Sequence, residues 1–273
     1  MKHLVSVDWL TRHLDEPNLV VVDASVMDAR GQELGIPGAV RFDIDGAFSR
    51  QEDGMRSMLP PGRFERELRK LGIRRGDRVV AYDANGIFSS ARAWWMLRSA
   101  DIKAAVLDGG LPAWREAGGS LTPVADDLGR DGDVEVCWEV SRFRNANWVE
   151  RRLEAADPVL DARSPERFSG DEDDPRPGVR AGHIPGSRSM HYASLQDGGR
   201  MLPVAELRER IHAYVDEPEQ PLTASCGSGV TACVIALAAT LAGHKHVSVY
   251  DGSWAEWGAA RSGHPVAKGD SGS

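Results

Sequence analysis

The sequence predicts an α/β protein of two tandem domains, each built on a mostly parallel central sheet flanked by helices. Two observations support this fold class. First, short apolar runs that suit buried strands alternate along the chain with segments of helical apolar spacing, as expected for βα units. Second, five motifs occur twice in the same order, three of them at a shift of 143 positions and two at nearby shifts.

The elements of the first half can be predicted in order. The expected elements are a strand over Leu19 to Ala24, a strand over Val40 to Asp45, a helix over Phe64 to Leu71, a strand over Arg78 to Asp83, a helix over Phe88 to Leu97 and a strand over Ala104 to Asp108. Gly72 ends the first of these helices. In the second half, Pro221 to Ala224 predicts a short buried strand, and the apolar run Val230 to Leu241 predicts a helix.

The internal repeat sets the expected domain boundaries. The segment Leu107 to Trp114 resembles Tyr250 to Trp257, and the same shift pairs Asp83 with Cys226. We expect a non-catalytic domain over residues 1–120, a linker over 121–136 in a region rich in Gly, Asp and Pro, and a catalytic domain over 137–273. Only the second copy has a cysteine at this position, so the first is expected to be a structural partner.

Composition narrows the classes of function. The chain has 273 residues and a net charge of -8, which argues against a nucleic-acid or anionic membrane surface as partner. No apolar run approaches the roughly 20 residues of a membrane span, and the N-terminus lacks a secretory signal, so we expect a cytoplasmic protein. Three cysteines without a CxxC pair suggest neither a disulfide framework nor a zinc cluster, and we expect no metal or cofactor.

Cys226 is the candidate nucleophile. It stands between a predicted buried strand and a glycine-spaced loop that leads into the apolar helix. Such a loop directs backbone N–H groups and a positive helix end at one sulfur, which favours the reactive thiolate form of a cysteine. The other two cysteines, Cys137 and Cys233, are expected to be buried small hydrophobic residues.

Three motifs then suggest a family. They are Gly182-His183-Ile184-Pro185-Gly186, Cys226-Gly227-Ser228-Gly229-Val230-Thr231 and Asp251-Gly252-Ser253-Trp254. With the tandem repeat, they resemble the tandem-domain sulfurtransferases of the rhodanese superfamily over nearly the whole chain. The loop after the cysteine resembles that of the 3-mercaptopyruvate branch, whereas thiosulfate-using members carry basic residues there. The neutral pair Gly227 and Ser228 agrees with this, because basic residues would suit the thiosulfate dianion.

The resemblance implies a set of site residues. Cys226 would carry a persulfide, and Arg167 and Arg176 would bind the donor carboxylate. The backbone of Gly227, Gly229, Val230 and Thr231 would hold the persulfide anion. Ser228 and Asp45 would belong to a proton relay, whose family histidine is replaced here by Ser57.

Each of these residues also has a purely structural interpretation. The two arginines could balance the acidic run Asp171 to Asp174 in a solvated loop, Ser228 could cap the following helix, and Asp45 could be a surface or capping aspartate. Structural roles are also expected for residues of the other motifs: a hydrogen bond from His183, loop fixation by Asp161 and Asp251, and packing in the core or at a domain interface by Trp254 and Trp257.

The implied reaction moves sulfane sulfur from 3-mercaptopyruvate through a Cys226 persulfide to cyanide or a thiol acceptor, such as thioredoxin or a small thiol, and releases pyruvate. Thiosulfate is the alternative donor. A non-enzymatic persulfide-carrying or partner-binding module is the alternative outside catalysis. A cysteine-dependent phosphatase is excluded because Ala232 stands where it needs arginine, and a nucleotide-binding loop is excluded because no lysine precedes Thr231.

Overall fold

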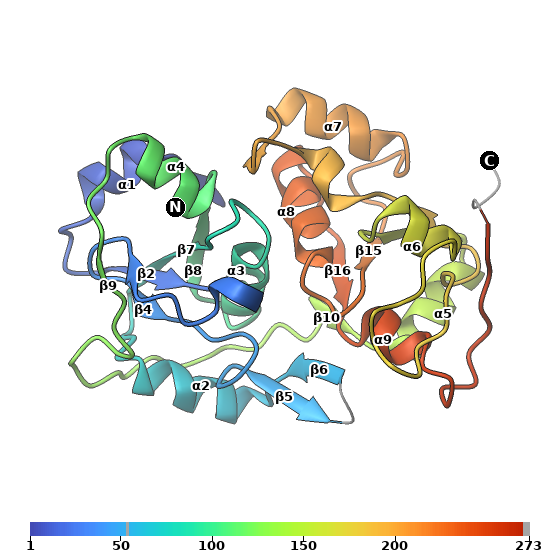
Figure 1. Cartoon of the computed structure of the whole chain (residues 1–273), viewed down its shortest axis with the longest axis horizontal. Coiled ribbons are helices and arrows are strands. Elements are labelled where there is room, and N and C mark those ends of the chain that lie inside the picture. The colour runs from blue at the N-terminus through green and yellow to red at the C-terminus, as the bar shows by residue number, and fades with distance from the viewer. Residues whose placement is uncertain (53–54, 270–273) are drawn as a thin grey trace. The chain divides into compact units, whose positions relative to one another are not determined.

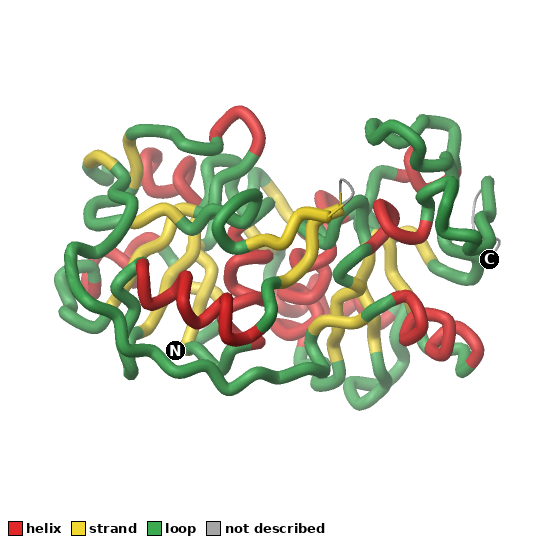
Figure 2. Tube along the Cα trace, turned by 90° about the horizontal axis from the view of Figure 1, so that it is seen from below, coloured by secondary structure: helices red, strands yellow, loops and turns green. Residues whose placement is uncertain are grey.

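The computed structural model describes residues 1–52 and 55–269 and forms two compact units (Figure 1). The first unit comprises Met1–Arg50, Met58–Glu139 and Gly198–Met201, and the second comprises Gln51–Ser57, Val140–Asp197 and Leu202–Ser273. Each unit contains one five-stranded parallel sheet, and Figure 2 shows helical segments beside the strands of each. The predicted fold class is therefore confirmed.

The first half of the chain contains short strands and helices in alternation. They are β1 (Leu4–Val5), α1 (Val7–His13), β2 (Leu19–Asp23), the 3-10 helix η1 (Met27–Ala29), β3 (Leu34–Gly35), β4 (Val40–Arg41), β5 (Ser49–Glu52), β6 (Met55–Met58), α2 (Pro61–Lys70), β7 (Arg78–Tyr82), α3 (Ser90–Ser99), β8 (Lys103–Leu107), α4 (Gly110–Glu116) and β9 (Thr122–Pro123).

The sheet of the first unit has the strand order β1-β8-β7-β2-β4. Alternate strand residues, such as Val21, Val80 and Ala105, pack in one core cluster with Leu10 of α1 and Trp114 of α4. Helix α3 contacts β7 and β8, and almost every one of its residues is buried. Burial on both faces explains why these strands are continuous apolar runs in the sequence.

The second half repeats this alternation. Its elements are β10 (Phe143–Arg144), α5 (Ala146–Glu154), β11 (Val159–Asp161), α6 (Pro165–Ser169), β12 (Arg188–Ser189), the 3-10 helix η2 (Tyr192–Leu195), β13 (Gln196–Asp197), β14 (Arg200–Met201), α7 (Val204–His212), β15 (Leu222–Ser225), α8 (Ala232–Ala242), β16 (Val247–Tyr250) and α9 (Ser253–Trp257).

The sheet of the second unit has the order β10-β16-β15-β11-β12. Val149 of α5 and Trp254 and Trp257 of α9 form one core cluster with Val159 of β11 and Tyr250 of β16, which confirms the core role expected for both tryptophans. Helix α8 contacts β15, β16 and α7, and nine of its 11 residues are buried. It is apolar on all sides for that reason.

Equivalent hydrogen bonds occur in the two units, as expected for two copies of one repeat. The Leu111 N–H donates to the carbonyl oxygen of Asp83 at 2.9 Å, and the Trp254 N–H donates to that of Cys226 at 2.9 Å. Both donors lie 28 positions after their acceptors in the sequence. The segment after β7 and the segment after β15 are therefore two versions of one local structure.

One predicted strand is much shorter in the structure, and the predicted linker makes hydrogen bonds. The strand predicted over residues 40–45 is limited to Val40–Arg41, because the chain turns at Asp43, whose carbonyl oxygen accepts from the N–H groups of Gly46 and Phe48. Residues 121–136, predicted as a linker, bond to the first unit: the Val134 N–H donates to Ile73, and Arg69 Nε donates to the Val134 carbonyl oxygen at 2.8 Å.

Among the described residues, no helix has the length and apolar character needed to cross a membrane.

Candidate active site

Cys226 follows β15 directly and lies at the carboxyl edge of the parallel sheet. The residue is 1% exposed. Gly229 in the loop has a φ of 76°, a left-handed conformation that glycine adopts without strain. Helix α8 begins only at Ala232, and its N-cap residue is Thr231, which makes no side-chain cap bond. The alternative role of Ser228 as the helix cap is therefore wrong, because the helix starts later than expected.

Ser253, at the start of α9, holds the cysteine loop. The Cys226 N–H donates to Ser253 Oγ at 3.1 Å, and this hydroxyl donates to the Tyr250 carbonyl oxygen at 2.7 Å. Ser253 has a φ of 49°, and its counterpart in the first repeat is Gly110, with a φ of 55°. A serine at a position that favours glycine suggests that its hydroxyl has a function. The motif containing Ser253 was noted in the sequence, but this role was not.

The loop after β7 shows what the repeated structure can bind. Asp83 is fully buried, and its two carboxyl oxygens accept from the N–H groups of Asn85, Phe88, Ser89 and Ser90 at 2.8–3.0 Å. Burial raises the pKa of Asp83 above its ordinary value, and these hydrogen bonds partly offset the effect. The loop is thus a cradle of N–H groups that holds a carboxyl group.

Of the four corresponding N–H groups after β15, that of Cys233 donates to the Val230 carbonyl oxygen at 3.1 Å, and the other three lack such an occupant among the residues described. At the shift of 143, Asn85, Phe88 and Ser89 correspond to Ser228, Thr231 and Ala232. In the described part of the chain, the N–H groups of these three residues have no hydrogen-bond acceptor. The loop around Cys226 therefore offers donors for an anion attached to the cysteine.

Arg167 and Arg176 both reach this loop. Arg167 lies in α6 and Arg176 in the following segment. A Cβ atom built on Gly227 would lie 3.2 Å from Arg167 Nη2 and 3.2 Å from both Nη1 and Nη2 of Arg176. Both guanidinium groups therefore pack over the residue that follows Cys226, where a side chain larger than that of glycine would make tight contacts with them.

Asp174 joins the two arginines. Arg167 Nη2 donates to Asp174 Oδ2 at 2.7 Å, and Arg176 Nη1 donates to Asp174 Oδ1 at 3.0 Å. The Asp174 side chain is 1% exposed. Burial raises the pKa of Asp174, but hydrogen bonds from Arg167 and Arg176 and their charges lower it more, so the pKa lies below its ordinary value. Sequence reasoning missed Asp174, which it placed in the solvated acidic run.

A second network fixes the strand β11 side of the site. Asp161 accepts from the backbone N–H and the guanidinium group of Arg163, whose Cζ lies 4.6 Å from the Trp254 ring centre. Arg163 Nη2 also donates to the Gly182 carbonyl oxygen at 2.9 Å. His183 Nδ1 lies 2.8 Å from the Phe168 carbonyl oxygen, and the two rings stack. The structural roles expected for Asp161 and His183 are confirmed.

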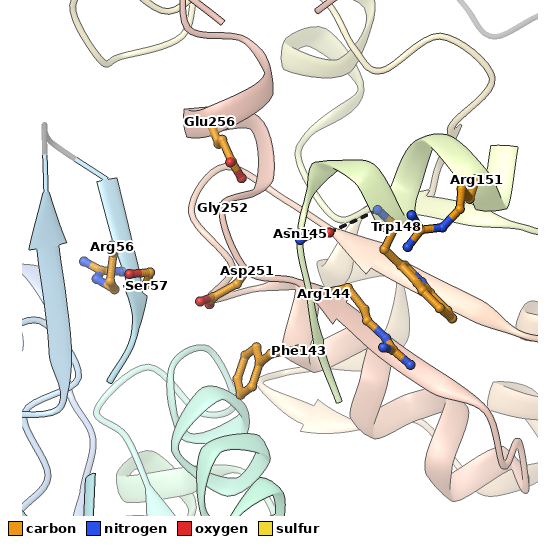
Figure 3. A pocket seen from close by; sticks show the side chains of 10 residues that line it. All are labelled: Arg56, Ser57, Phe143, Arg144, Asn145, Trp148, Arg151, Asp251, Gly252 and Glu256. Atoms are coloured by element: carbon orange, nitrogen blue, oxygen red, sulfur yellow. Dashed lines mark hydrogen bonds between the residues drawn. The ribbon is translucent and has the colours of Figure 1, made fainter. Parts of the chain in front are cut away.

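A cavity of about 530 Å³ opens beside the start of α9 (Figure 3). The residues that line it are Arg56, Ser57, Phe143, Arg144, Asn145, Trp148, Arg151, Asp251, Gly252 and Glu256. Figure 3 shows the Asp251 side chain directed toward the side of the cavity that Arg56 and Ser57 form. Ser57, which replaces the histidine implied by the family resemblance, is therefore a lining residue of this cavity.

The remaining predicted residues have varied surroundings. Asp45 lies in the first unit, where its N–H donates to Asp43 Oδ1 at 3.1 Å, and its part in a proton relay stays a prediction. Cys233 is buried as expected, and its Sγ donates to the Gly229 carbonyl oxygen at 3.3 Å. The prediction for Cys137 is wrong: it is exposed, because it lies in an irregular segment outside any helix or strand.

No group of three or more His, Cys, Asp or Glu residues that could hold a metal ion occurs within residues 1–52 and 55–269.

Comparison with known proteins places this site in a family. The model of the rhodanese-like domain matches residues 6–117 and 145–260. The chain is 36% identical to thiosulfate/3-mercaptopyruvate sulfurtransferase 1, mitochondrial, of Arabidopsis thaliana, over 93% of this chain and 75% of the relative. It is 36% identical to 3-mercaptopyruvate sulfurtransferase of Escherichia coli K12, over 96% of each chain.

A solved structure agrees with these matches. The crystal structure of SseA from Escherichia coli, described as a 3-mercaptopyruvate sulfotransferase with the rhodanese fold, superposes with a TM-score of 0.81 at 31% identity. The match covers 93% of this chain and 99% of that one. Two matched domains and relatives of more than 30% identity over nearly the whole chain lead to one conclusion: the chain belongs to the rhodanese-like family.

Proposed function

We propose that the chain is a 3-mercaptopyruvate sulfurtransferase that carries sulfur as a persulfide on Cys226. The observation that supports this most strongly is the position of two guanidinium groups over Gly227, next to the cysteine. A guanidinium group can bind a carboxylate with two parallel hydrogen bonds, and a keto acid needs such a group near the reacting sulfur.

In the first half-reaction, the Cys226 thiolate attacks the thiol sulfur of 3-mercaptopyruvate. An S–S bond forms, the C–S bond breaks, and its electron pair leaves as the enolate of pyruvate. The proton of the donor thiol is released, and the enolate carbon gains a proton, so the products are pyruvate and a Cys226 persulfide anion. Arg167 and Arg176 stabilise the negative charge that develops on the enolate oxygen. Ser228, which lies in the cysteine loop, and Asp45 are the candidate groups for proton transfer.

In the second half-reaction, cyanide or a thiolate attacks the outer sulfur, and Cys226 leaves as a thiolate. Between the two half-reactions, the N–H groups of the loop hold the persulfide anion. The first repeat supports this, because each oxygen of Asp83 is two bonds from Cβ, as the outer sulfur of a cysteine persulfide is. The catalytic domain is then the second one, and the first is non-catalytic. A thiol acceptor such as thioredoxin and a cytoplasmic location complete the proposal.

Steady-state kinetics with both donors tests the proposal. With cyanide as acceptor, kcat/KM should be higher for 3-mercaptopyruvate than for thiosulfate, and Cys226→Ser should abolish turnover of both. Cys233→Ser and Cys137→Ser are the matched controls and should retain activity. A higher kcat/KM for thiosulfate would refute the donor assignment, and full activity in Cys226→Ser would refute the mechanism.

A further inference from the structure

We propose that Asp174 determines donor specificity, by fixing Arg167 and Arg176 at the cysteine loop and lowering their combined charge from +2 to +1. The inference rests on the proposed function, since it concerns the donor of the same reaction. Asp174 is a positioning residue in this account, because its carboxylate acts through the two guanidinium groups.

Asp174 differs from its acidic neighbours in burial and in contacts. Asp171, Glu172 and Asp173 are exposed, and Asp171 accepts a hydrogen bond from Ser169. Asp174 has a side chain with 1% exposure, and it contacts both arginines. Its Oδ1 also accepts from the Arg176 N–H at 3.0 Å, so it holds the backbone as well as the side chain of that arginine.

Asp174 contacts only part of each guanidinium group. Asp174 takes one terminal nitrogen of each arginine, Nη2 of Arg167 and Nη1 of Arg176. Arg167 Nε is buried, and no partner for it is found among the residues described. Arg176 Nη2 lies 3.2 Å from the position of a Cβ on Gly227. Arg176 Nη2, which Asp174 does not use, is therefore held at the loop that carries the cysteine.

Charge then distinguishes the donors. The lowered pKa of Asp174 keeps its carboxylate ionised at neutral pH, so the three side chains together carry one positive charge. A keto acid whose single carboxylate is charged balances this site. Thiosulfate has two negative charges, so one of them would have no positive charge to balance it. The free-energy cost of such an unpaired charge is high in partly buried surroundings. Without Asp174, two adjacent guanidinium groups would repel each other and would suit a dianion better.

The test is the ratio of kcat/KM values for 3-mercaptopyruvate and thiosulfate, measured with cyanide in Asp174→Asn. The substitution keeps the shape of the side chain and removes its charge. We expect kcat/KM for 3-mercaptopyruvate to fall about tenfold or more, mainly through KM, and the ratio to shift toward thiosulfate by a similar factor. Asp173→Asn, in the exposed neighbour, should leave both values unchanged.

A second variant separates the effect of the site's charge from the effect of arginine positioning. It also keeps the test decisive if Asp174→Asn folds poorly. The double variant Arg167→Gln/Asp174→Asn restores a single positive charge, and its ratio should return toward the wild-type preference. An equal loss for both donors in Asp174→Asn, or a double variant with the same ratio as the single one, would overturn the inference. Either result leaves the proposed function intact, provided that wild type uses 3-mercaptopyruvate and Cys226→Ser does not.

Discussion

At the scale of single residues, the two repeats differ in what their loops hold. After β7, the carboxyl group of Asp83 fills a cradle of four N–H groups, whereas after β15 three of the four equivalent donors have no acceptor among the described residues. A buried N–H group without a partner is costly, so the loop in the second unit gains most when an anion is attached to Cys226. In the loop after β7, the Asp83 carboxyl group already accepts hydrogen bonds from the four N–H groups.

This account predicts that Asp83→Ala destabilises the protein. The substitution leaves buried N–H groups without an acceptor, and the free energy of unfolding should fall by about 3 kcal/mol or more. Urea denaturation measures this change. Asp126→Asn is the matched control because the Asp126 side chain is 95% exposed, and it should change the free energy of unfolding very little. Equal stability of Asp83→Ala and wild type would contradict the cradle role of Asp83.

The sequence shows the residues of the site more readily than their partners. Cys226 could be found from its loop, and Arg167 and Arg176 from their positions relative to the family motifs. Asp174 could not be singled out, because four acidic residues in a row have the same local pattern, and only tertiary contacts bury one of them. The exposed Cys137 was mispredicted for a related reason, since burial depends on packing that composition does not describe.

At the scale of elements, the start of α9 positions Cys226. The Ser253 hydroxyl oxygen accepts a hydrogen bond from the Cys226 N–H. The N–H groups of Trp254 and Ala255 donate to the carbonyl oxygens of Cys226 and Gly227, respectively. The short helix therefore holds the loop both through an N–H group that the loop donates and through carbonyl oxygens with which the loop accepts. Its own first residue has a left-handed backbone, which costs energy for any residue except glycine.

Two substitutions of Ser253 separate the role of its hydroxyl group from the cost of its left-handed backbone. In Ser253→Ala the Cys226 N–H loses its acceptor, and kcat should fall about tenfold. Ser253→Gly loses the same acceptor but accommodates the φ of 49° without strain, so its kcat should fall equally while its melting temperature exceeds that of Ser253→Ala. Steady-state kinetics and thermal unfolding measure these effects. Wild-type kcat in either variant would refute the positioning role.

Strands buried on both faces were the most predictable elements. Leu19–Asp23 and Arg78–Tyr82 agree with the predicted runs to within one residue, because a strand covered on both faces is apolar at nearly every position. Helix α8 begins two residues later than predicted, since the apolar residue Val230 belongs to the glycine-containing loop and not to the helix. Apolar character alone does not mark where a catalytic loop ends.

At the scale of the whole molecule, three buried or partly buried histidines make stability depend on pH. Burial lowers the pKa of His183, His191 and His244 below the ordinary value of 6.5. The folded state then favours the neutral imidazole, and the unfolded state binds more protons. The stability from these groups is therefore present above the ordinary pKa and is lost as the pH falls toward the lower folded-state pKa values.

His183 offers a specific test of this dependence. Asp83 and Asp108, whose pKa values are raised by burial, act in the opposite direction, so single variants must be compared with wild type. From about pH 7.5 to about pH 5.5, His183→Gln should lose less unfolding free energy than wild type does. His246→Gln, an exposed control, should follow wild type closely. Denaturation at both pH values gives these differences, and a steeper loss in His183→Gln would contradict the prediction.

The central claim is that sulfur from 3-mercaptopyruvate is attached to Cys226, and peptide mass spectrometry tests it most directly. After incubation with this donor and no acceptor, the peptide containing Cys226 should gain the mass of one sulfur atom. Pyruvate should be released in equal amount, and cyanide should reverse the mass change. Sulfur on Cys137 or Cys233 with Cys226 unmodified, or pyruvate released at the wild-type rate by Cys226→Ser, would contradict the account.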